Sequence, residues 1–358
     1  MEGSEKLLEE LSNALGPSGF ENSVREIVKR EFVSLGCEVE IDGLGSVVGR
    51  LPGTYDYPRV MLAAHMDEVG LIVKYITEQG YVKFETLGGW LDQALINQRW
   101  LIMTKIGPVL GVTGIKTPHV MNAESKSKVF AKTDMFLDVG ACDRQDAMEN
   151  LGILPGDPIA PQSTFSKFGT GDVYLGKAWD DRAGIWVMLE VLKHLSKAGI
   201  NNLYGVATVQ EEVGLRGAGT SGTLVNPQIG INIESGVAGD YPGITMDEAQ
   251  ERVGAGPGLF LHDSSMLPNL KLRDFVVRTA EELQIPLQFN VLSGYGQDGA
   301  AIQKTGTGVP VVNITIPTRY LHSHNSVISG YDLDLAVQLV TRLVQKLDAA
   351  TVGEIITF

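Results

Sequence analysis

The spacing of hydrophobic residues predicts two helices near the start of the chain, over residues 5–15 and 21–35. In the second, apolar residues recur on one face, as expected of a helix that packs on a core. The residues on this face are Val24, Ile27, Val28, Phe32 and Leu35. Two short β-type runs follow, "CEVEID" and "GSVVGRL", and then a continuous apolar run that ends at His65, "RVMLAAH". Continuous apolar runs are typical of buried strands in a sheet that helices cover.

The pattern changes between about Leu71 and Phe165, where short β-type runs alternate with Gly and Pro turns and helical spacing is almost absent. Examples are "LIVKYITEQGYVKFETLGG" and "RWLIMTKIGPVLGVTGIKT". This pattern predicts a small β domain inserted into the chain. We therefore expect residues 1–69 and 166–358 to form two segments of one domain, with residues 70–165 as the insertion.

After the insertion, strand and helix patterns alternate again. Helical spacing covers residues 183–198, the β-type runs "LYGVATVQEE" and "QIGINIES" follow, and another helix is predicted over residues 270–283. The C-terminal helix carries one apolar stripe, which consists of Leu333, Ala336, Leu339, Val340, Leu343 and Leu347. Alternating strands and helices on both sides of the insertion predict one three-layer α/β domain built from two sequence segments.

Composition narrows the class of protein. The 358 residues are about right for two domains of roughly 150 residues each. The net charge of -14, from 29 Lys and Arg against 43 Asp and Glu, would repel nucleic acids and anionic membranes. We find no apolar run near the ~18 residues of a membrane-spanning helix, and the two cysteines, Cys37 and Cys142, form no paired framework. We expect a soluble cytoplasmic protein without nucleic-acid or membrane partners.

Residues that commonly bind metals recur where the predicted strands end or turn. They are His65 with Asp67 two residues on, Asp180 and Asp181, Glu211 and Glu212, Glu234, and His322 with His324 nearby. Each alone has a simpler explanation as a helix cap, a solvated acid or a satisfied histidine. In open α/β sheets, however, ligands bind beyond the carboxyl ends of the strands, where the loops converge. The recurrence therefore predicts one site at this edge.

The combination of residue types favours a metal site. Two histidines and several carboxylates at one sheet edge would resist burial unless a cation were present. Mixed nitrogen and oxygen ligands suit zinc, cobalt or manganese, and they suffice for two ions only if one carboxylate bridges them. Glu211 and Glu212 are adjacent, so on an extended chain they would point in opposite directions and need not share one role.

Four motifs, "AHMDEVG", "GKAWDDR", "VQEEVGLRGA" and "RYLHSH", resemble in this order the tetrahedral (TET-like) aminopeptidase family of dinuclear metallopeptidases, which includes glutamyl and deblocking aminopeptidases. The resemblance covers nearly the whole chain. It implies a three-layer αβα exopeptidase domain with an inserted small β-barrel, a PDZ-like domain. It also implies two divalent ions per subunit, zinc or cobalt most of all, and a dimer-based assembly of twelve subunits through the inserted domain.

The resemblance further implies a role for each site residue. The implied metal ligands are His65, Asp180, Glu212, Glu234 and His322. Asp180 would bridge the two ions, and Asp67 would orient the ring of His65. Glu211 would act as the general base that takes a proton from a bridging water and later gives one to the leaving amine. The implied activity is the removal of N-terminal residues from short peptides.

Two positions depart from the family pattern. Glu234 stands where such aminopeptidases commonly have Asp, and glutamate there is more typical of carboxypeptidases and deacylases in the wider superfamily. "SGYGQDGAA" replaces a pattern closer to Gly-Gly-Thr-Asp, so we expect Tyr295 and Gln297 to reshape the substrate pocket near Asp298. A metal-dependent carboxypeptidase or N-acyl amino acid deacylase is therefore the alternative function, and a non-catalytic assembly protein is less favoured. A glycosidase would need no metal and is disfavoured.

Overall fold

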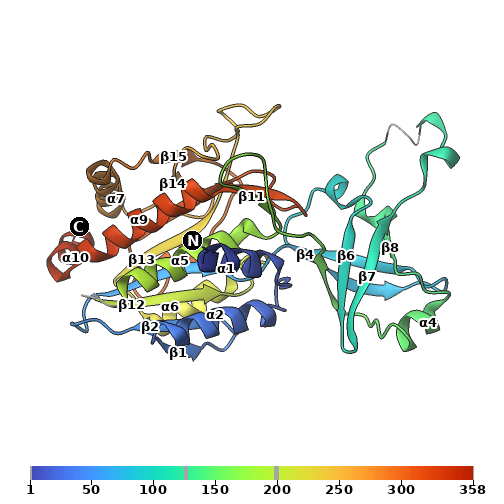
Figure 1. Cartoon of the computed structure of the whole chain (residues 1–358), viewed down its shortest axis with the longest axis horizontal. Helices are drawn as coiled ribbons and strands as arrows, with labels where there is room; N and C mark the ends of the chain where they lie inside the picture. The colour runs from blue at the N-terminus through green and yellow to red at the C-terminus, as the bar shows by residue number, and fades with distance from the viewer. Residues whose placement is uncertain (1, 125–127, 197–200, 358) are drawn as a thin grey trace.

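A mixed eight-stranded sheet forms the centre of the larger part of the molecule (Figure 1). The computed structural model describes residues 2–124, 128–196 and 201–357. The strands, in their order across the sheet, are β1 (Glu38–Ile41), β2 (Val47–Leu51), β12 (Asn202–Thr208), β3 (Arg59–His65), β13 (Ile229–Val237), β16 (Val311–Thr318), β14 (Gly258–His262) and β15 (Gln288–Val291). The adjacent strands β12, β3, β13 and β16 run parallel, so their carboxyl ends lie at one edge of the sheet.

Apolar side chains cover both faces of this sheet. In β3, Leu62 and Ala64 belong to one buried cluster, whereas Met61 and Ala63 belong to another, because successive side chains of a strand point to opposite faces. The first cluster includes side chains from α1 (Glu2–Asn13), α2 (Asn22–Ser34), α5 (Trp179–Leu195), α7 (Leu270–Leu283), α9 (Gly330–Lys346) and α10 (Ala349–Ile356). The second includes side chains from α6 (Arg216–Val225) and α8 (Gly299–Gln303). Burial on both faces explains the continuous apolar sequence of β3.

Most helices agree with the hydrophobic spacing. The predicted helices over 5–15, 21–35 and 270–283 correspond to α1, α2 and α7, and the predicted stripe of α9 is buried. Helix α5 begins at Trp179, earlier than expected, and residues 197–198 of that prediction lie outside the described residues. Hydrophobic spacing does not predict α6, because its sequence "RGAGTSGTLV" contains three glycines, the weakest helix formers after proline.

Six strands between Gly70 and Pro161 close into a β-barrel at one end of the molecule (Figure 1). In their order around the barrel they are β4 (Gly70–Ile76), β5 (Val82–Leu87), β8 (Phe136–Asp138), β7 (Gly107–Gly114), β6 (Arg99–Thr104) and β9 (Pro158–Pro161). The barrel has an apolar core of its own, which includes Leu71, Trp100 and Leu137, and the short helix α4 (Arg144–Glu149) adds Ala147. The small β-barrel that the sequence predicts for this stretch is therefore present as a closed barrel.

The barrel and the sheet meet close to the edge that carries the site residues. The Trp100 ring of β6 meets the His324 ring edge-on, with 4.4 Å between centroids. His324 Nε2 also lies 2.9 Å from the carbonyl oxygen of Arg99. A small sheet of β10 (Ser166–Lys167), β11 (Val173–Gly176) and β17 (Ser326–Ser329) lies along the connection from the barrel back to α5. His324 therefore packs on the barrel.

Both cysteines are free thiols. Burial raises the pKa of the half-buried Cys37 to about 11, so this thiol stays protonated at neutral pH. Among the helices of the described residues, none is long and apolar enough to cross a membrane.

Candidate metal centre

The parallel strands bring the predicted site residues to one edge of the sheet. His65 is the last residue of β3 and is aligned with Thr208 of β12. On the other side of β3, Ala63 is aligned with Asn232 of β13, which brings Glu234, two residues further on, to the level of His65. His322 lies in the loop that follows β16. The strand register thus brings together residues that are far apart in the sequence.

Asp180, at the start of α5, lies between the two histidines. Its Oδ1 is 3.0 Å from His65 Nε2, and its Oδ2 is 3.4 Å from His322 Nε2. Glu234 Oε1 is 3.3 Å from His65 Nε2, and Glu212 Oε1 is 3.2 Å from His322 Nε2. The five predicted ligands therefore form one continuous row of donor atoms with Asp180 at its centre.

These side chains are largely buried, and carboxylates outnumber the groups that can balance them. Burial opposes protonation of His65, but the negative charge of Glu234 and the hydrogen bond to Asp180 raise its pKa well above the ordinary value. Burial raises the pKa of Glu234 to about 7. Burial alone would raise the pKa of Asp180 too, but hydrogen bonds with His322 and His65 outweigh burial and lower this pKa below its ordinary value. Such a cluster favours the binding of positive charge.

Asp67 connects the loops that carry these residues. It is fully buried and accepts hydrogen bonds from Ser18 Oγ at 2.6 Å and from the backbone N–H groups of Glu211 at 2.9 Å and Glu212 at 3.2 Å. Its backbone carbonyl lies 3.0 Å from His65 Nδ1, while His65 Nε2 faces Asp180. Asp67 therefore fixes both the histidine ring and the backbone of the two glutamates.

The two glutamates lie in a turn and not on a strand. Strand β12 ends at Thr208, and Gln210 has a left-handed backbone with φ of 57°. The expectation that they alternate on an extended chain is therefore wrong, and the hydrogen bonds to Asp67 hold their backbone instead. Burial raises the pKa of Glu211 well above its ordinary value, although the charge of His65 acts against the rise. Both glutamates line a cavity of about 290 Å³, together with Asp180, Glu234 and His322.

Residues 45–339 match the model of the M42 glutamyl aminopeptidase family. The chain belongs to this family. The glutamyl aminopeptidase of Lactococcus lactis is 33% identical, with 96% of this chain and 97% of that protein covered. The crystal structure of a TET aminopeptidase from a marine-sediment thaumarchaeon has a TM-score of 0.96 and 44% identity, with 99% of both chains covered. The TET1 peptidase of Pyrococcus horikoshii has a TM-score of 0.86 and 29% identity, with 96% of this chain and 100% of that chain covered.

Family membership makes this M42 protein an aminopeptidase, a hydrolase of peptide bonds, and confirms the resemblance to TET aminopeptidases. The carboxypeptidase, deacylase and non-catalytic alternatives are not favoured. The family is metal-dependent, and two groups of three side chains in the described residues could hold a metal ion. The groups are His65, Asp181 and Glu234, and Asp180, Glu212 and His322, with the ligand atoms of each group within 4.8 Å of one another.

Asp181 belongs to the first of these groups, although the family resemblance implies no role for it. Its two carboxylate oxygens accept backbone N–H groups, from His65 at 3.1 Å and from Gly184 at 3.0 Å. Burial raises its pKa well above the ordinary value. In the sequence of this M42 chain, the adjacent acids of "WDDR" indicate that both residues lie near the site. The sequence does not show that Asp180 faces the histidines while Asp181 accepts backbone N–H groups.

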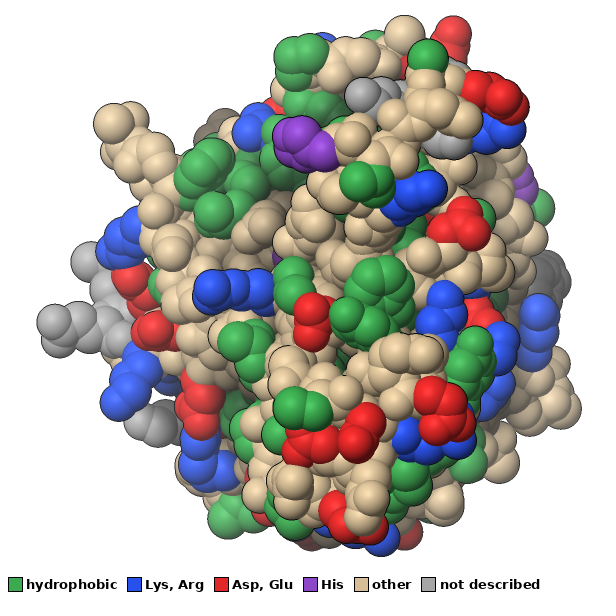
Figure 2. Space-filling view, turned by 90° about the vertical axis from the view of Figure 1, so that its right-hand side faces the viewer, with side chains coloured by type: hydrophobic (Ala, Val, Ile, Leu, Met, Phe, Trp, Pro, Cys, Tyr) green, Lys and Arg blue, Asp and Glu red, His purple; other side chains and the backbone are tan. Residues whose placement is uncertain are grey.

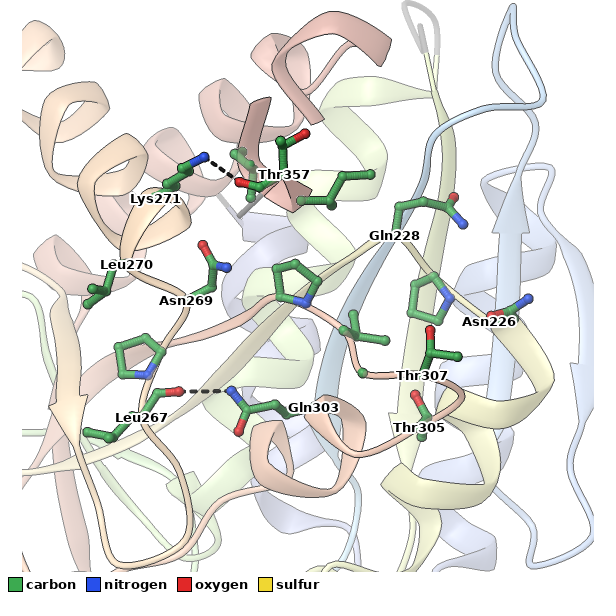
Figure 3. Close-up of a pocket in the computed structure, with 17 residues that line it drawn as sticks. Asn226, Gln228, Leu267, Asn269, Leu270, Lys271, Gln303, Thr305, Thr307 and Thr357 are labelled. Carbon is green, nitrogen blue, oxygen red and sulfur yellow. Dashed lines mark hydrogen bonds between the residues drawn. The ribbon is translucent and has the colours of Figure 1, made fainter. Parts of the chain in front are cut away.

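A larger cavity, of about 950 Å³, lies at the opposite edge of the sheet (Figure 3). Gln228 and Pro310, which line it, directly precede β13 and β16, so it lies at the amino ends of the parallel strands. Gln303 Nε2 donates to the Leu267 carbonyl at 2.8 Å. Among the described residues that line this cavity there is no His, Asp, Glu or Cys. Its ionisable lining residue among those described is Lys271, whose Nζ donates to the backbone carbonyls of Glu354 and Thr357. The cavity therefore lacks a set of metal-binding side chains, and the smaller cavity is the candidate active site of this M42 enzyme.

Proposed function

We propose that this M42 aminopeptidase removes N-terminal residues from short peptides at a centre of two divalent metal ions, zinc or cobalt. In this proposal His65, Asp180 and Glu234 hold one ion, and Asp180, Glu212 and His322 hold the other. The observation that carries the proposal is the position of Asp180, whose two oxygens each face a histidine nitrogen, at 3.0 Å and 3.4 Å. A carboxylate in this position is suited to bridge two ions.

The chemistry of the donor set supports this assignment. Imidazole nitrogen and carboxylate oxygen are ligands that zinc and neighbouring divalent ions accept. In the part of the chain that the structure describes, Glu234 Oε2 is a buried atom without a hydrogen-bond donor. Burial of an unpaired carboxylate oxygen is unfavourable unless a cation is close. The residues present therefore fit two divalent ions.

The protein's own groups would orient the reaction and move protons. When bound, the ions would polarise the scissile carbonyl and make a water molecule more acidic. In the proposal Glu211, buried at the wall of the cavity, takes a proton from the attacking water and passes it to the leaving amine. Asp67 keeps His65 in orientation through its carbonyl and holds the backbone of Glu211 through its carboxylate.

Removal and return of metal tests the centre. The full-length chain should hydrolyse aminoacyl p-nitroanilides, lose this activity after dialysis against a chelator, and regain it with Zn²⁺ or Co²⁺. Elemental analysis at each step should give two ions per subunit in the active samples. Turnover that survives removal of the ions would contradict the metal mechanism.

The variant Glu211→Gln tests the proton transfer separately from metal binding. We expect kcat to fall by about 10²–10⁴-fold, the usual contribution of a general base, while the metal content and the assembly stay as in the wild type. Glu40→Gln is a matched control, since it makes the same change on the exposed side of β1 and should keep the wild-type kcat. A wild-type kcat for Glu211→Gln would assign the base to another residue.

We also propose that residues 1–69 and 166–358 form a three-layer αβα exopeptidase domain, and that residues 70–165 form a PDZ-like domain that mediates self-association. Figure 2, which views the barrel end, shows hydrophobic side chains among charged ones. The exposed apolar side chains of the barrel include Ile106, Leu110, Val112, Val120 and Val129, with 41–72% of each exposed. The related TET1 peptidase of Pyrococcus horikoshii can assemble into a tetrahedron or a large octahedral shell. These observations support a dimer-based dodecamer.

Sedimentation of a barrel variant tests the assembly. Leu110→Lys places a charge on the exposed apolar surface of β7 and should give smaller particles than the wild type. Leu44→Lys changes a comparably exposed leucine, 43% against 50%, outside the barrel and should keep the wild-type mass. Loss of assembly in both variants, or in neither, would contradict the role of the barrel.

We further propose a cytoplasmic location, which the two free cysteines support.

A further inference from the structure

Apart from its acids and His322, the cavity of the candidate active site has uncharged walls. These wall residues are Gly89, Gly214, Leu215, Gly294, Tyr295 and Gly296. The volume of about 290 Å³ lies near the lower end of the range for small-molecule sites. The remaining lining residues are those to which we assign metal binding and proton transfer, so these six are the residues left to contact the substrate's side chain.

None of the described residues that line this cavity is Lys or Arg. The cations carried by the neighbouring loops are engaged elsewhere. Lys177 Nζ pairs with Glu68 Oε1 at 2.7 Å, and Arg182 donates through Nε to the Met66 carbonyl at 2.7 Å. Arg319, in the loop before His322, pairs with Asp240. Arg216, which follows Leu215, is exposed, donates to Gln210 Oε1 at 3.1 Å and does not line the cavity. An acidic substrate side chain would therefore enter the cavity without a cationic side chain to balance it, which is unfavourable in a desolvated site.

The Tyr295 ring is a fixed wall. It stacks on the Phe260 ring, with 5.4 Å between centroids and 20° between planes, and its hydroxyl donates to the Ser235 carbonyl at 2.8 Å. Since Ser235 follows Glu234 directly, this hydrogen bond holds the ring beside the proposed metal ligands. Burial raises the pKa of Tyr295 well above its ordinary value, so the ring stays uncharged. Tyr295 presents an aromatic surface that suits apolar groups.

The glycines leave room beside this ring. An added Cβ would meet no atom within 4 Å at Gly214 or Gly294, and at Gly296 its nearest neighbour would be 3.7 Å away. Gly89 lies against the metal site, because an added Cβ there would be 3.3 Å from His322 Nδ1. The open side of the cavity is therefore bordered by backbone that carries no side chain.

We propose that this enzyme prefers N-terminal residues with an uncharged, apolar side chain, such as leucine, methionine or phenylalanine, and that Tyr295 and Leu215 contact that side chain. The preference thus differs from the one in the family name, which refers to glutamyl substrates. The inference rests on the proposed function, because it takes the cavity beside the metal centre as the place of the first residue.

A substrate panel tests the preference on the wild-type, metal-loaded chain. We expect kcat/KM for leucyl p-nitroanilide to exceed the values for glutamyl and lysyl p-nitroanilide by at least about tenfold. Binding of the free products, measured by calorimetry, should follow the same order, with leucine tighter than glutamate. A glutamyl or lysyl optimum would overturn this inference alone. Failure to cleave any aminoacyl anilide would instead overturn the proposed function.

The variant Leu215→Lys adds the missing cation. We expect the ratio of glutamyl to leucyl kcat/KM to rise by about tenfold or more, because the lysine supplies a counter-charge at the cavity wall. Leu224→Lys makes the same change within α6, on a residue that is 41% exposed and does not line the cavity, and should leave the ratio unchanged. If the ratio of glutamyl to leucyl kcat/KM is the same in both variants, Leu215 does not contact the substrate's side chain.

Discussion

Glu251→Gln changes a carboxyl group that is fully buried among strands β13 to β16. Glu251 Oε1 accepts hydrogen bonds from the side chains of Asn290 and Thr315. Its carboxyl group occupies space that glycines leave open, since an added Cβ at Gly236 or Gly258 would lie 1.8 Å or 1.7 Å from its oxygens. Glutamine has nearly the same shape as a protonated glutamate, so the change removes the titration and keeps the packing.

The expected magnitude follows from the pKa of Glu251. Burial raises this pKa from the ordinary 4.5 to about 8, although hydrogen bonds with Thr315 and Asn290 act against the rise. Between these pH values the folded protein holds a proton that the unfolded chain has lost. The contribution to stability is therefore complete below about pH 4.5 and is lost as the pH rises through 8. A difference of about 3.5 pH units corresponds to about 5 kcal/mol at 1.36 kcal/mol per unit.

Guanidinium unfolding at pH 5, 7 and 9, at fixed protein and metal concentrations, measures this effect. The stability of Glu251→Gln relative to the wild type should increase from pH 5 to pH 9 by about 4 kcal/mol, because the unfolded glutamate is already largely ionised at pH 5. Glu281→Gln, on the exposed side of α7, is the matched control, and its difference from the wild type should stay constant. Two results would refute a protonated Glu251 in the folded protein. One is a difference in unfolding free energy between Glu251→Gln and the wild type that does not change with pH, and the other is a wild type that becomes more stable than the variant as the pH rises.

Three further variants probe the surroundings of the site. Asp67→Ala should weaken metal binding by about 10–100-fold in a metal titration, because its hydrogen bonds hold the ligand loops. Lys177→Met removes the nearest cation of the buried Glu68, which keeps the Gly16 N–H at 3.0 Å and Arg182 Nη2 at 3.8 Å, and should lower the free energy of unfolding by about 3–5 kcal/mol in guanidinium. A loss below about 1 kcal/mol would contradict the importance of the Lys177–Glu68 pair. Gly88→Ala should weaken metal binding because its Cβ would lie 2.7 Å from Val69 Cγ1 and 3.1 Å from Glu212 Oε2, which must both shift. Gly140→Ala has similar φ strain and an open surrounding, so it should not affect metal binding.

The sequence by itself determined the local elements and the chemical class. The apolar run before His65 predicted a buried strand, and the stripe from Leu333 to Leu347 predicted the face of α9 that is buried. The β-type runs after Leu71 predicted the inserted barrel. These predictions succeed because hydrophobic spacing is a property of neighbouring residues and reflects which side of an element is buried. The ordered motifs likewise sufficed to predict the family.

Tertiary structure alone decided how the site residues face one another. The direction of Asp180 toward two histidines, while Asp181 holds backbone N–H groups, follows from the turn at the start of α5. The placement of Glu211 in a turn follows from the left-handed Gln210 and from hydrogen bonds to Asp67. Strand order and register set the distances between these residues. They arise from the packing of segments far apart in the chain, and no local pattern in the sequence encodes them.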